Sequence, residues 1–415
     1  MLKLALNLLS GPIWAKEYFL PSASVESADV LCTTMGGLQQ MLAGNALLTK
    51  LVLVRASPDD TFYENTARAE FIERLEDRYG GVGFLDVQDP SLPVSSYSAR
   101  RMTFKDFSDA LQARSGMELD NARLPLNFLN LRDFLSLPEP PSARMSRFQL
   151  LQTLDARIES AIVPDASSAG KKIISRYLDV ASCSRFLLFA CRGAVSGFHV
   201  DLLTGTWVQA VSGRKAWPII TNLSDEERLE FQKHGHEWTP PSDKVRMLVL
   251  EPGDLLVMPP GCLTPHAPIT IDDCLMHGGM FWDEKRVIDI VESINWIIRH
   301  PKVTNEPVPN QLPEILFELH RLIREKPHRF LRGDQTIEEL LQKFEAARIV
   351  VAYWRMLDDD ALDKVGALSI AVFSIREWRD KNGGTHAVMA DVFIKKDGTQ
   401  EDVDAALEDA FKNIK

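Results

Sequence analysis

The chain has 415 residues, of which 45% are hydrophobic and 25% charged, with a formal net charge of −11. This length exceeds the roughly 250–300 residues at which a single core stops growing, so we expect two or three structural units. No apolar run approaches the ~20 residues of a membrane span. The acidic excess argues against binding nucleic acid through charge, and is compatible with a basic protein or peptide partner.

The cysteines and the first residues bear on the compartment. The five cysteines are odd in number, scattered and without a C-x-x-C pair, which predicts free thiols in the nucleus or cytoplasm rather than a zinc module or disulfides. The start, M-L-K-L-A-L-N-L-L-S, resembles a secretory signal. Because Asn7 and Ser10 interrupt its apolar run, a packed N-terminal helix is the preferred interpretation.

Residues 1–120 have the pattern of a mixed α/β region. Leu51–Val54 is a short, bounded apolar run typical of a buried strand. Thr66–Tyr79 has helical periodicity and ends at two glycines. Thr103 is a candidate N-cap of a further short helix. A proline-rich connecting loop is expected over residues 121–145.

From about residue 146 the pattern changes to short strands. Four apolar runs are separated by glycine and proline turns: residues 186–190, 206–211, 247–250 and 255–258. Such spacing is typical of an all-β sandwich or barrel. Residues 221–245 interrupt it, and there Ser224 and Glu227 have the spacing of a capping box, which predicts an inserted helix.

Residues 286–415 carry helical periodicity and no obvious chemical motif. Helices are expected over residues 287–300, from Pro313 to about Arg324, from Thr336 to about Met356, over about 362–380, and from about Glu401. The third has another capping box, formed by Thr336 and Glu339.

The stretch from Ser196 to His266 contains the chemistry. His199 and Asp201 are two residues apart, so on a strand both face the same side. His266 follows the strand–turn segment P-G-D-L-L-V-M-P-P-G. Two imidazoles and a carboxylate hold iron and leave three positions open for a co-substrate and oxygen. Lys215, expected inside the same apolar barrel, needs an anionic partner that a dicarboxylate co-substrate could supply.

Other histidines compete with this interpretation. Taken alone, His199 would be a core histidine with its hydrogen bonds satisfied, and only the company of Asp201, Lys215 and His266 favours a metal. His234 and His236, in H-G-H, are predicted to lie in a solvated loop. His300 is predicted to complement a helix dipole at a C-terminus.

The motifs S-G-F-H-V-D, G-T-W-V-Q-A-V-S-G-R-K-A-W and E-P-G-D-L-L-V-M-P-P-G…T-P-H resemble the JmjC family of Fe(II)- and 2-oxoglutarate-dependent oxygenases of the cupin superfamily, above all its small fungal proteins. The resemblance covers about residues 121–285. It implies an α+β protein: an α/β lead-in (1–120), a double-stranded β-helix or jelly-roll core (121–285) and a helical C-terminal domain (286–415), whose helices can mediate a homodimer.

The resemblance also implies roles for individual residues. His199, Asp201 and His266 match the iron ligands, and Lys215 matches the residue that pairs with the distal carboxylate of 2-oxoglutarate. Ser196 and Thr206 match positions that often donate to that carboxylate. The sequence departs from the family where V-G-G-H-F is usual, because L-M-H-G-G-M-F makes His277 a competitor for the third ligand position.

The implied reaction oxidises a substrate C–H bond with release of succinate and carbon dioxide. Hydroxylation of a protein side chain is the preferred expectation, because the sequence shows no chromatin-reader module. Histone-lysine demethylation by the same chemistry is the close alternative. A catalytically silent scaffold whose helical tail binds partners is the third.

Overall fold

The computed structural model describes residues 30–43, 47–56, 64–80, 84–88, 99–114, 126–161, 180–241, 244–306, 308–309, 311–346, 349–351, 367–379 and 385–395. They belong to two compact units. The first is formed by the residues up to 145, residues 182–281 and residues 302–305. The second is formed by residues 146–181, residues 282–301 and the residues from 306 on. The predicted N-terminal helix and the helix from Glu401 lie outside the described residues.

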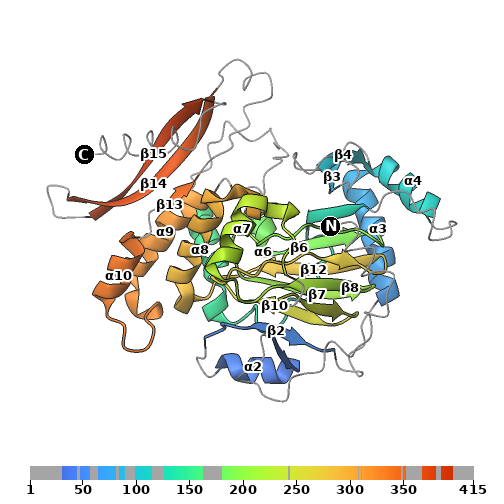
Figure 1. Ribbon diagram of the computed structural model, residues 1–415, viewed down its shortest axis with the longest axis horizontal. Coiled ribbons are helices and arrows are strands. Elements are labelled where there is room, and N and C mark those ends of the chain that lie inside the picture. The colour runs from blue at the N-terminus through green and yellow to red at the C-terminus, as the bar shows by residue number, and fades with distance from the viewer. Residues whose placement is uncertain are drawn as a thin grey trace. The chain divides into compact units, whose positions relative to one another are not determined.

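A nine-stranded sheet forms the body of the first unit (Figure 1). Strands β1 and β2 run parallel, and every other neighbouring pair is antiparallel. In spatial order the strands are β1 (Val30–Thr33), β2 (Leu51–Val54), β10 (Leu255–Met258), β7 (Thr206–Ser212), β12 (Cys274–Met280), β6 (Phe186–Ala190), β5 (Asn127–Arg132), β3 (Phe84–Gln88) and β4 (Ala99–Thr103).

A second sheet of the same unit has three antiparallel strands, β11 (Ile269–Thr270), β8 (Lys215–Ile219) and β9 (Arg246–Leu250). Every residue of β8 and β10 is buried. Strand β10 is accordingly a continuous apolar run in the sequence, whereas β8 begins with Lys215. The four predicted strands at residues 186–190, 206–211, 247–250 and 255–258 are therefore confirmed. The molecule is a mixed α/β protein with a large, mostly antiparallel sheet.

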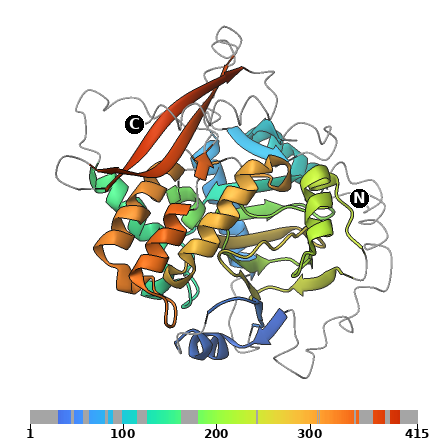
Figure 2. The same ribbon diagram turned by 60° about the vertical axis from the view of Figure 1, so that its left-hand side comes forward.

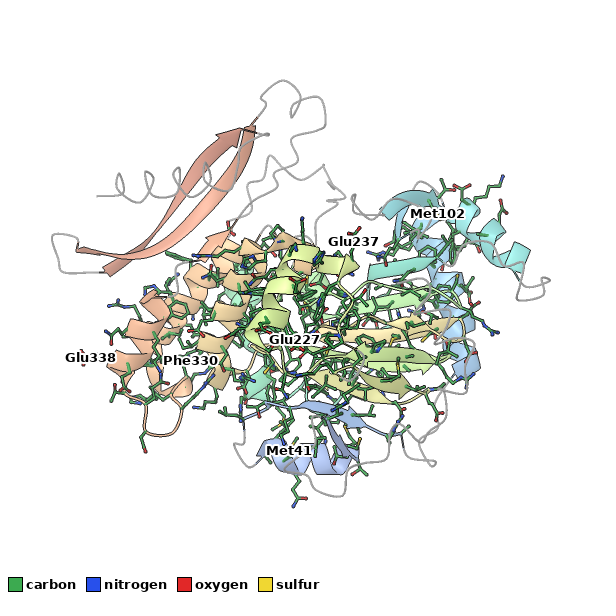
Figure 3. The ribbon with its side chains drawn as sticks, viewed as in Figure 1. Met41, Met102, Glu227, Glu237, Phe330 and Glu338 are labelled. Carbon is green, nitrogen blue, oxygen red and sulfur yellow. The ribbon has the colours of Figure 1, made fainter. Side chains whose placement is uncertain are left out.

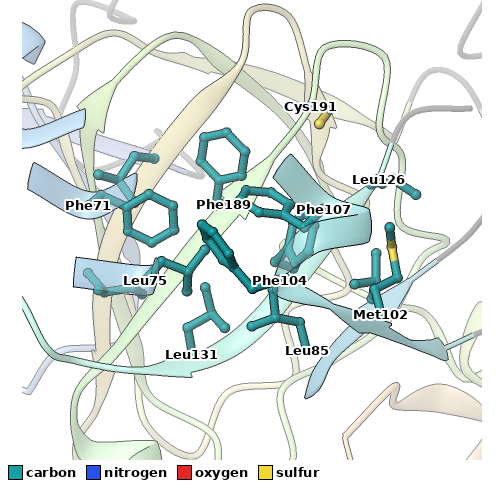
Figure 4. Close-up of a cluster of buried hydrophobic side chains, with 14 of the residues drawn as sticks. Phe71, Leu75, Leu85, Met102, Phe104, Phe107, Leu126, Leu131, Phe189 and Cys191 are labelled. Atoms are coloured by element: carbon teal, nitrogen blue, oxygen red, sulfur yellow. The ribbon is translucent and has the colours of Figure 1, made fainter. Parts of the chain in front are cut away.

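Aromatic packing joins the helices of this unit to its sheet (Figure 4). Helix α3 (Glu64–Tyr79), as predicted, places Phe71 against Phe189 of β6 with ring centroids 5.2 Å apart. Helix α4 (Phe104–Arg114) places Phe107 edge-on to Phe128 at 4.7 Å. Thr103 caps α4 as predicted, since its Oγ1 accepts a 3.1 Å hydrogen bond from the backbone of Asp106. Two shorter helices are α2 (Met35–Ala43) in this unit and α6 (Val180–Ser184) at its boundary in the sequence with the second unit.

The segment between β8 and β9 forms helix α7 (Asp225–His234) and the 3₁₀ turn η5 (Gly235–Glu237). The predicted capping box is present: Ser224 accepts from the backbone of Glu227, and Glu227 accepts from the backbone of Ser224. Figure 3 marks Glu227 and Glu237, which lie in the first turn of α7 and at the end of η5.

The second unit is built on helices (Figure 2). They are α5 (Leu150–Ala161), α8 (Val287–Arg299), α9 (Leu312–Glu325) and α10 (Ile337–Ala346). Helix α5 packs on α9, where Arg157 binds Glu318 at 2.9 Å and Glu325 at 3.0 Å. The predicted helices beginning near residues 287, 313 and 336 are confirmed, and α10 begins with the predicted capping box of Thr336 and Glu339.

The prediction for the next part of this unit is wrong. Helix α10 ends at Ala346, and strand β13 (Ile349–Val351) follows instead of a helix to Met356. The helix expected over residues 362–380 is strand β14 (Ala367–Arg379), which pairs with β15 (Thr385–Lys395). The two strands pair along almost their whole length, and this pairing outweighs the weak helical periodicity of β14. The sequence of β14 alone does not reveal its pairing partner.

Two predictions from composition can be compared with the structure. All five cysteines are free thiols, as expected. None of the helices in the described ranges is long and apolar enough to cross a membrane.

Candidate metal centre

His199 and His266 are brought together by the backbone. The N–H of each residue donates to the carbonyl of the other, at 3.0 and 2.9 Å. Directly paired residues of antiparallel strands project their side chains to the same face, and here the two imidazole centroids lie 4.3 Å apart. His199 is 6% exposed and His266 is 2% exposed, so both residues are almost fully removed from solvent.

Asp201 reaches the same place through a tight turn. Thr204 and Gly205 both adopt positive φ (51° and 75°), and the chain reverses so that the Thr206 hydroxyl donates to Asp201 Oδ2 at 2.5 Å. A side chain at Gly205 would place Cβ 2.4 Å from the carbonyl oxygen of Phe281, so only glycine fits there. Asp201 Oδ1 lies 3.5 Å from His266 Nε2. One ligand atom from each of the three residues lies within 4.8 Å of the others.

The hydrogen bonds of the two imidazoles fix which nitrogen can bind a metal. Nδ1 of His199 contacts the carbonyl oxygen of Gly197 at 2.7 Å, and Nδ1 of His266 contacts that of Thr264 at 2.9 Å. A carbonyl only accepts, so each Nδ1 carries the proton, and in the neutral ring each Nε2 keeps a free lone pair. Histidine ligands of metals are generally oriented by this kind of outer hydrogen bond.

The charge state of His199 also suits a metal ligand. Burial, with the neighbouring rings of His266 and His236, holds the pKa of His199 well below its usual range. The ring is therefore neutral at neutral pH, which is the form that binds metal ions. Two imidazoles and one carboxylate match the donor set of Fe(II) in non-haem oxygenases, so the residues present fit the implied iron.

Lys215 is the buried cation of this region. It is 3% exposed, and no ion pair joins it to a carboxylate in the part of the chain that the structure describes. Burial lowers the pKa of Lys215, opposed by its interaction with Cys274. Burying an ammonium group without a carboxylate partner costs folding free energy. Lys215 therefore indicates a binding position for an anion.

The two remaining predicted residues have partners of their own. Thr206 donates its hydroxyl proton to Asp201, so in this structure it orients a candidate ligand rather than facing an anion. The Ser196 hydroxyl lies 3.2 Å from Asn127 Nδ2 and 3.3 Å from Gln88 Oε1. Asn127 was not predicted as a site residue. The asparagine within the apolar run P-L-N-F-L is nevertheless a signal, because a buried amide needs hydrogen-bond partners.

His277 does not join the metal group that the structure assembles from described residues. It lies in β12, where its Nε2 is 3.7 Å from Asp133 and its ring is edge-on to Trp207 at 4.8 Å. Neither ring nitrogen has a hydrogen-bond partner. Burial lowers the pKa of His277 to about 4, with Asp133 opposing and Arg185 reinforcing the shift.

The H-G-H segment corrects a prediction. His234 is exposed, as expected, and lies 3.2 Å from Glu230. His236 is not in a solvated loop: its ring centroid is 6.1 Å from that of His199, and its Nε2 contacts the carbonyl oxygen of Thr304 at 3.1 Å. Gly197 permits this approach, because a Cβ there would lie 2.5 Å from the His236 carbonyl oxygen. Only tertiary packing, which spacing in the sequence does not reveal, brings His236 to the site.

Comparison with known proteins gives two family matches. Residues 169–284 match the JmjC domain family JmjC_2. Residues 372–413 match the HrmA family, described as subtelomeric hrmA-associated cluster protein. The first match contains His199, Asp201, Lys215 and His266, and the second begins within β14.

Two curated proteins are similar over parts of the chain. One is the KK-1 biosynthesis cluster protein D of Curvularia clavata, 31% identical over 79% of this chain and 32% of its own length. The other is the JmjC domain-containing histone demethylation protein 1 of Caenorhabditis elegans, 27% identical over 27% of this chain and 11% of its own length. The chain thus spans about a third and about a tenth of these relatives. As its motifs predicted, this chain contains a JmjC domain, at residues 169–284.

Proposed function

We propose that the JmjC domain is an Fe(II)- and 2-oxoglutarate-dependent oxygenase that hydroxylates a protein side chain, and that its core is a double-stranded β-helix. The observation that carries the proposal is the group of His199, Asp201 and His266, with both Nδ1 atoms hydrogen-bonded to backbone carbonyls and both Nε2 atoms left free. With Fe(II) bound, such a site would use molecular oxygen and 2-oxoglutarate together: one oxygen atom would enter succinate as carbon dioxide is released, and the other would enter a substrate C–H bond.

The chain's own residues divide the work of binding and positioning. His199, Asp201 and His266 hold the metal on one side, and the Thr206 hydroxyl fixes the orientation of the Asp201 carboxylate. Lys215 supplies the positive charge for the distal carboxylate of 2-oxoglutarate, which in turn neutralises the buried ammonium. The nearly complete burial of both histidines excludes bulk water from one side of the metal.

Demethylation of a histone lysine is a second candidate. It is supported by the similarity of part of this chain to a protein that is named a histone demethylation protein. The same oxidation applied to an N-methyl carbon gives an unstable product that loses formaldehyde, so the two outcomes share the metal centre and differ in the substrate. Similarity to a biosynthesis cluster protein supports an enzymatic rather than a silent role.

Incubating the protein with Fe(II), 2-oxoglutarate and a peptide library tests the proposal. We expect succinate above a control without iron, and a peptide mass gain of one oxygen atom. Loss of one methylene mass would identify the demethylase instead. Succinate that is absent with every peptide, or equal in Asp201→Ala, would leave the scaffold as the explanation.

The C-terminal part supports a separate proposal about partners. We propose that the second unit mediates a homodimer or binds a partner, as the resemblance implies for the helices that follow such a domain. Sedimentation of the purified chain tests the dimer, with a single monomeric species as the result against it.

A further inference from the structure

Three buried hydrogen-bond donors lie along one face of strand β8. Lys215 and Trp217 are two residues apart on this strand, so they share a face. Thr270 of β11 is paired directly with Lys215 and therefore projects to the same face. Thr270 is 0% exposed, and Lys215 and Trp217 are each 3% exposed.

Among the described residues, two of the three groups have no hydrogen-bond partner, and the third has no carboxylate partner. The Thr270 hydroxyl and the Trp217 indole N–H lack a hydrogen-bond partner, and Lys215 has no carboxylate within ion-pair distance. Buried polar groups without partners are uncommon in folded proteins, because each loses its hydration without replacement. Two such groups and a buried ammonium lie on one face, and all three can donate a hydrogen bond, so an anionic acceptor would satisfy them together.

The same face leads directly to the metal group. The Trp217 ring is stacked on the His266 imidazole, with centroids 5.2 Å apart and planes at 27°. Lys215 is also close enough to His199 to depress its pKa. An anion held at Lys215 and Thr270 therefore lies on the strand face that also carries Trp217, the residue that stacks on His266 of the metal group.

We infer that the Thr270 hydroxyl is a second donor to the distal carboxylate of the co-substrate, acting together with Lys215. This inference rests on the proposed function and adds a residue that the motif does not contain. A carboxylate has two oxygens, and two donors from neighbouring strands bind it with a defined orientation that a lone ammonium does not impose. Thr270 is thus a specificity residue for a 2-oxo acid with a second carboxylate.

The test is a calorimetric titration of the protein loaded with Mn(II). Mn(II) replaces Fe(II) because the Mn(II) protein is stable in air and does not turn over. The ligands are 2-oxoglutarate and 2-oxopentanoate, which has the same chain length and lacks the distal carboxylate. We expect Thr270→Val to bind 2-oxoglutarate about tenfold more weakly and 2-oxopentanoate unchanged. Thr270→Ser should keep wild-type affinity, because it retains the hydroxyl.

Each result has a distinct meaning. Equal 2-oxoglutarate affinity in wild type and Thr270→Val overturns the inference. It is also overturned if Thr270→Val binds both ligands more weakly by the same factor, or if Thr270→Ser binds 2-oxoglutarate more weakly than the wild type. The melting temperature of ligand-free Thr270→Val should not fall, since the hydroxyl has no partner to lose; a marked fall assigns Thr270 a structural role and also overturns the inference. If wild-type protein binds Mn(II) and not 2-oxoglutarate, the proposed function itself fails.

Discussion

Two buried histidine environments in the first unit differ in how their rings are held. At the metal group, His199 and His266 each donate Nδ1–H to a carbonyl, and Asp201 lies 3.5 Å from His266 Nε2. In β12, His277 is equally buried and also lies near a carboxylate, Asp133 at 3.7 Å, yet neither of its nitrogens is hydrogen-bonded. The carboxylates differ too: Asp201 accepts from a neutral hydroxyl, whereas Asp133 is bound by Arg185 at 2.8 Å.

This difference shows that burial next to a carboxylate does not make a metal ligand. A ligand needs a fixed tautomer, a free lone pair and a carboxylate whose charge is not already neutralised. His266 and Asp201 meet these conditions, whereas Asp133 is already paired with Arg185 and His277 lacks a partner that fixes its tautomer. Each of the four predictions below changes one of the two environments, and the first two use the other environment as the control.

The largest effect is expected from matched replacement of the two competing histidines. His266→Leu should weaken Fe(II) or Co(II) binding more than about 100-fold, because loss of a ligand should exceed the 10–100-fold effect of an outer hydrogen bond. His277→Leu should bind metal as the wild type does. Metal titration by calorimetry measures both, and a loss of binding in His277→Leu alone would exchange the roles of the two histidines.

The two aspartates should separate in the same way. Asp201→Asn removes a negative ligand and should reduce metal affinity by a similar factor with little change in unfolding free energy. Asp133→Asn weakens the charged hydrogen bond to Arg185 and should destabilise the fold by about 1–3 kcal/mol, with metal affinity unchanged. Metal titration and denaturant unfolding of both variants measure the two quantities. If Asp201→Asn and Asp133→Asn changed metal affinity and unfolding free energy to a similar extent, the prediction would be contradicted.

A smaller effect is expected from the hydroxyl that orients Asp201. Thr206→Val removes the hydrogen bond to Asp201 Oδ2 and should weaken metal binding roughly tenfold. Thr206→Ser keeps a hydroxyl and should restore most of the affinity. If Thr206→Val left the metal affinity unchanged and weakened only 2-oxoglutarate binding, Thr206 would have the role that the family resemblance implies.

The smallest effect concerns pH and the His277 environment. The folded-state pKa of His277, about 4, is below the ordinary 6.5 of the unfolded chain. The unfolded state therefore takes up the proton first as the pH falls, and stability is lost between about pH 6.5 and 4. Between pH 6.5 and 5.5 this group should account for about 1 kcal/mol.

His277→Leu should remove this part of the pH dependence. The measurement is the difference in unfolding free energy between wild type and variant at several pH values, taken without metal. A difference that does not change with pH would contradict the assignment of a neutral, buried His277.

Part of this structure could be read from the sequence because the signals are local. The strand at 255–258 is a continuous apolar run, the strand at 206–211 is mostly apolar, and the Ser224–Glu227 capping box is a four-residue pattern. The spacing of His199 and Asp201, with His266 after a strand and turn, predicted that the three lie together, and their ligand atoms are within 4.8 Å of one another.

The rest depends on contacts between distant segments. His236 reaches the site only because Gly197 leaves room for it, and the Thr270 hydroxyl matters only because β11 pairs with β8 at Lys215. Strand β14 was mistaken for a helix, since its partner β15 decides the structure and lies after the segment in question. In the first two cases the deciding partner is distant in the sequence, and in the third it is the strand that follows.

The central claim is that His199, Asp201 and His266 hold Fe(II) so that 2-oxoglutarate binds beside it. Anaerobic titration followed by visible absorption tests this most directly, because a 2-oxo acid chelating Fe(II) gives a metal-to-ligand charge-transfer band that neither component shows alone. We predict that band in wild-type protein and in His277→Leu, and its absence in Asp201→Ala. No band in the wild type, or an equal band in Asp201→Ala, would contradict the assignment of this metal centre.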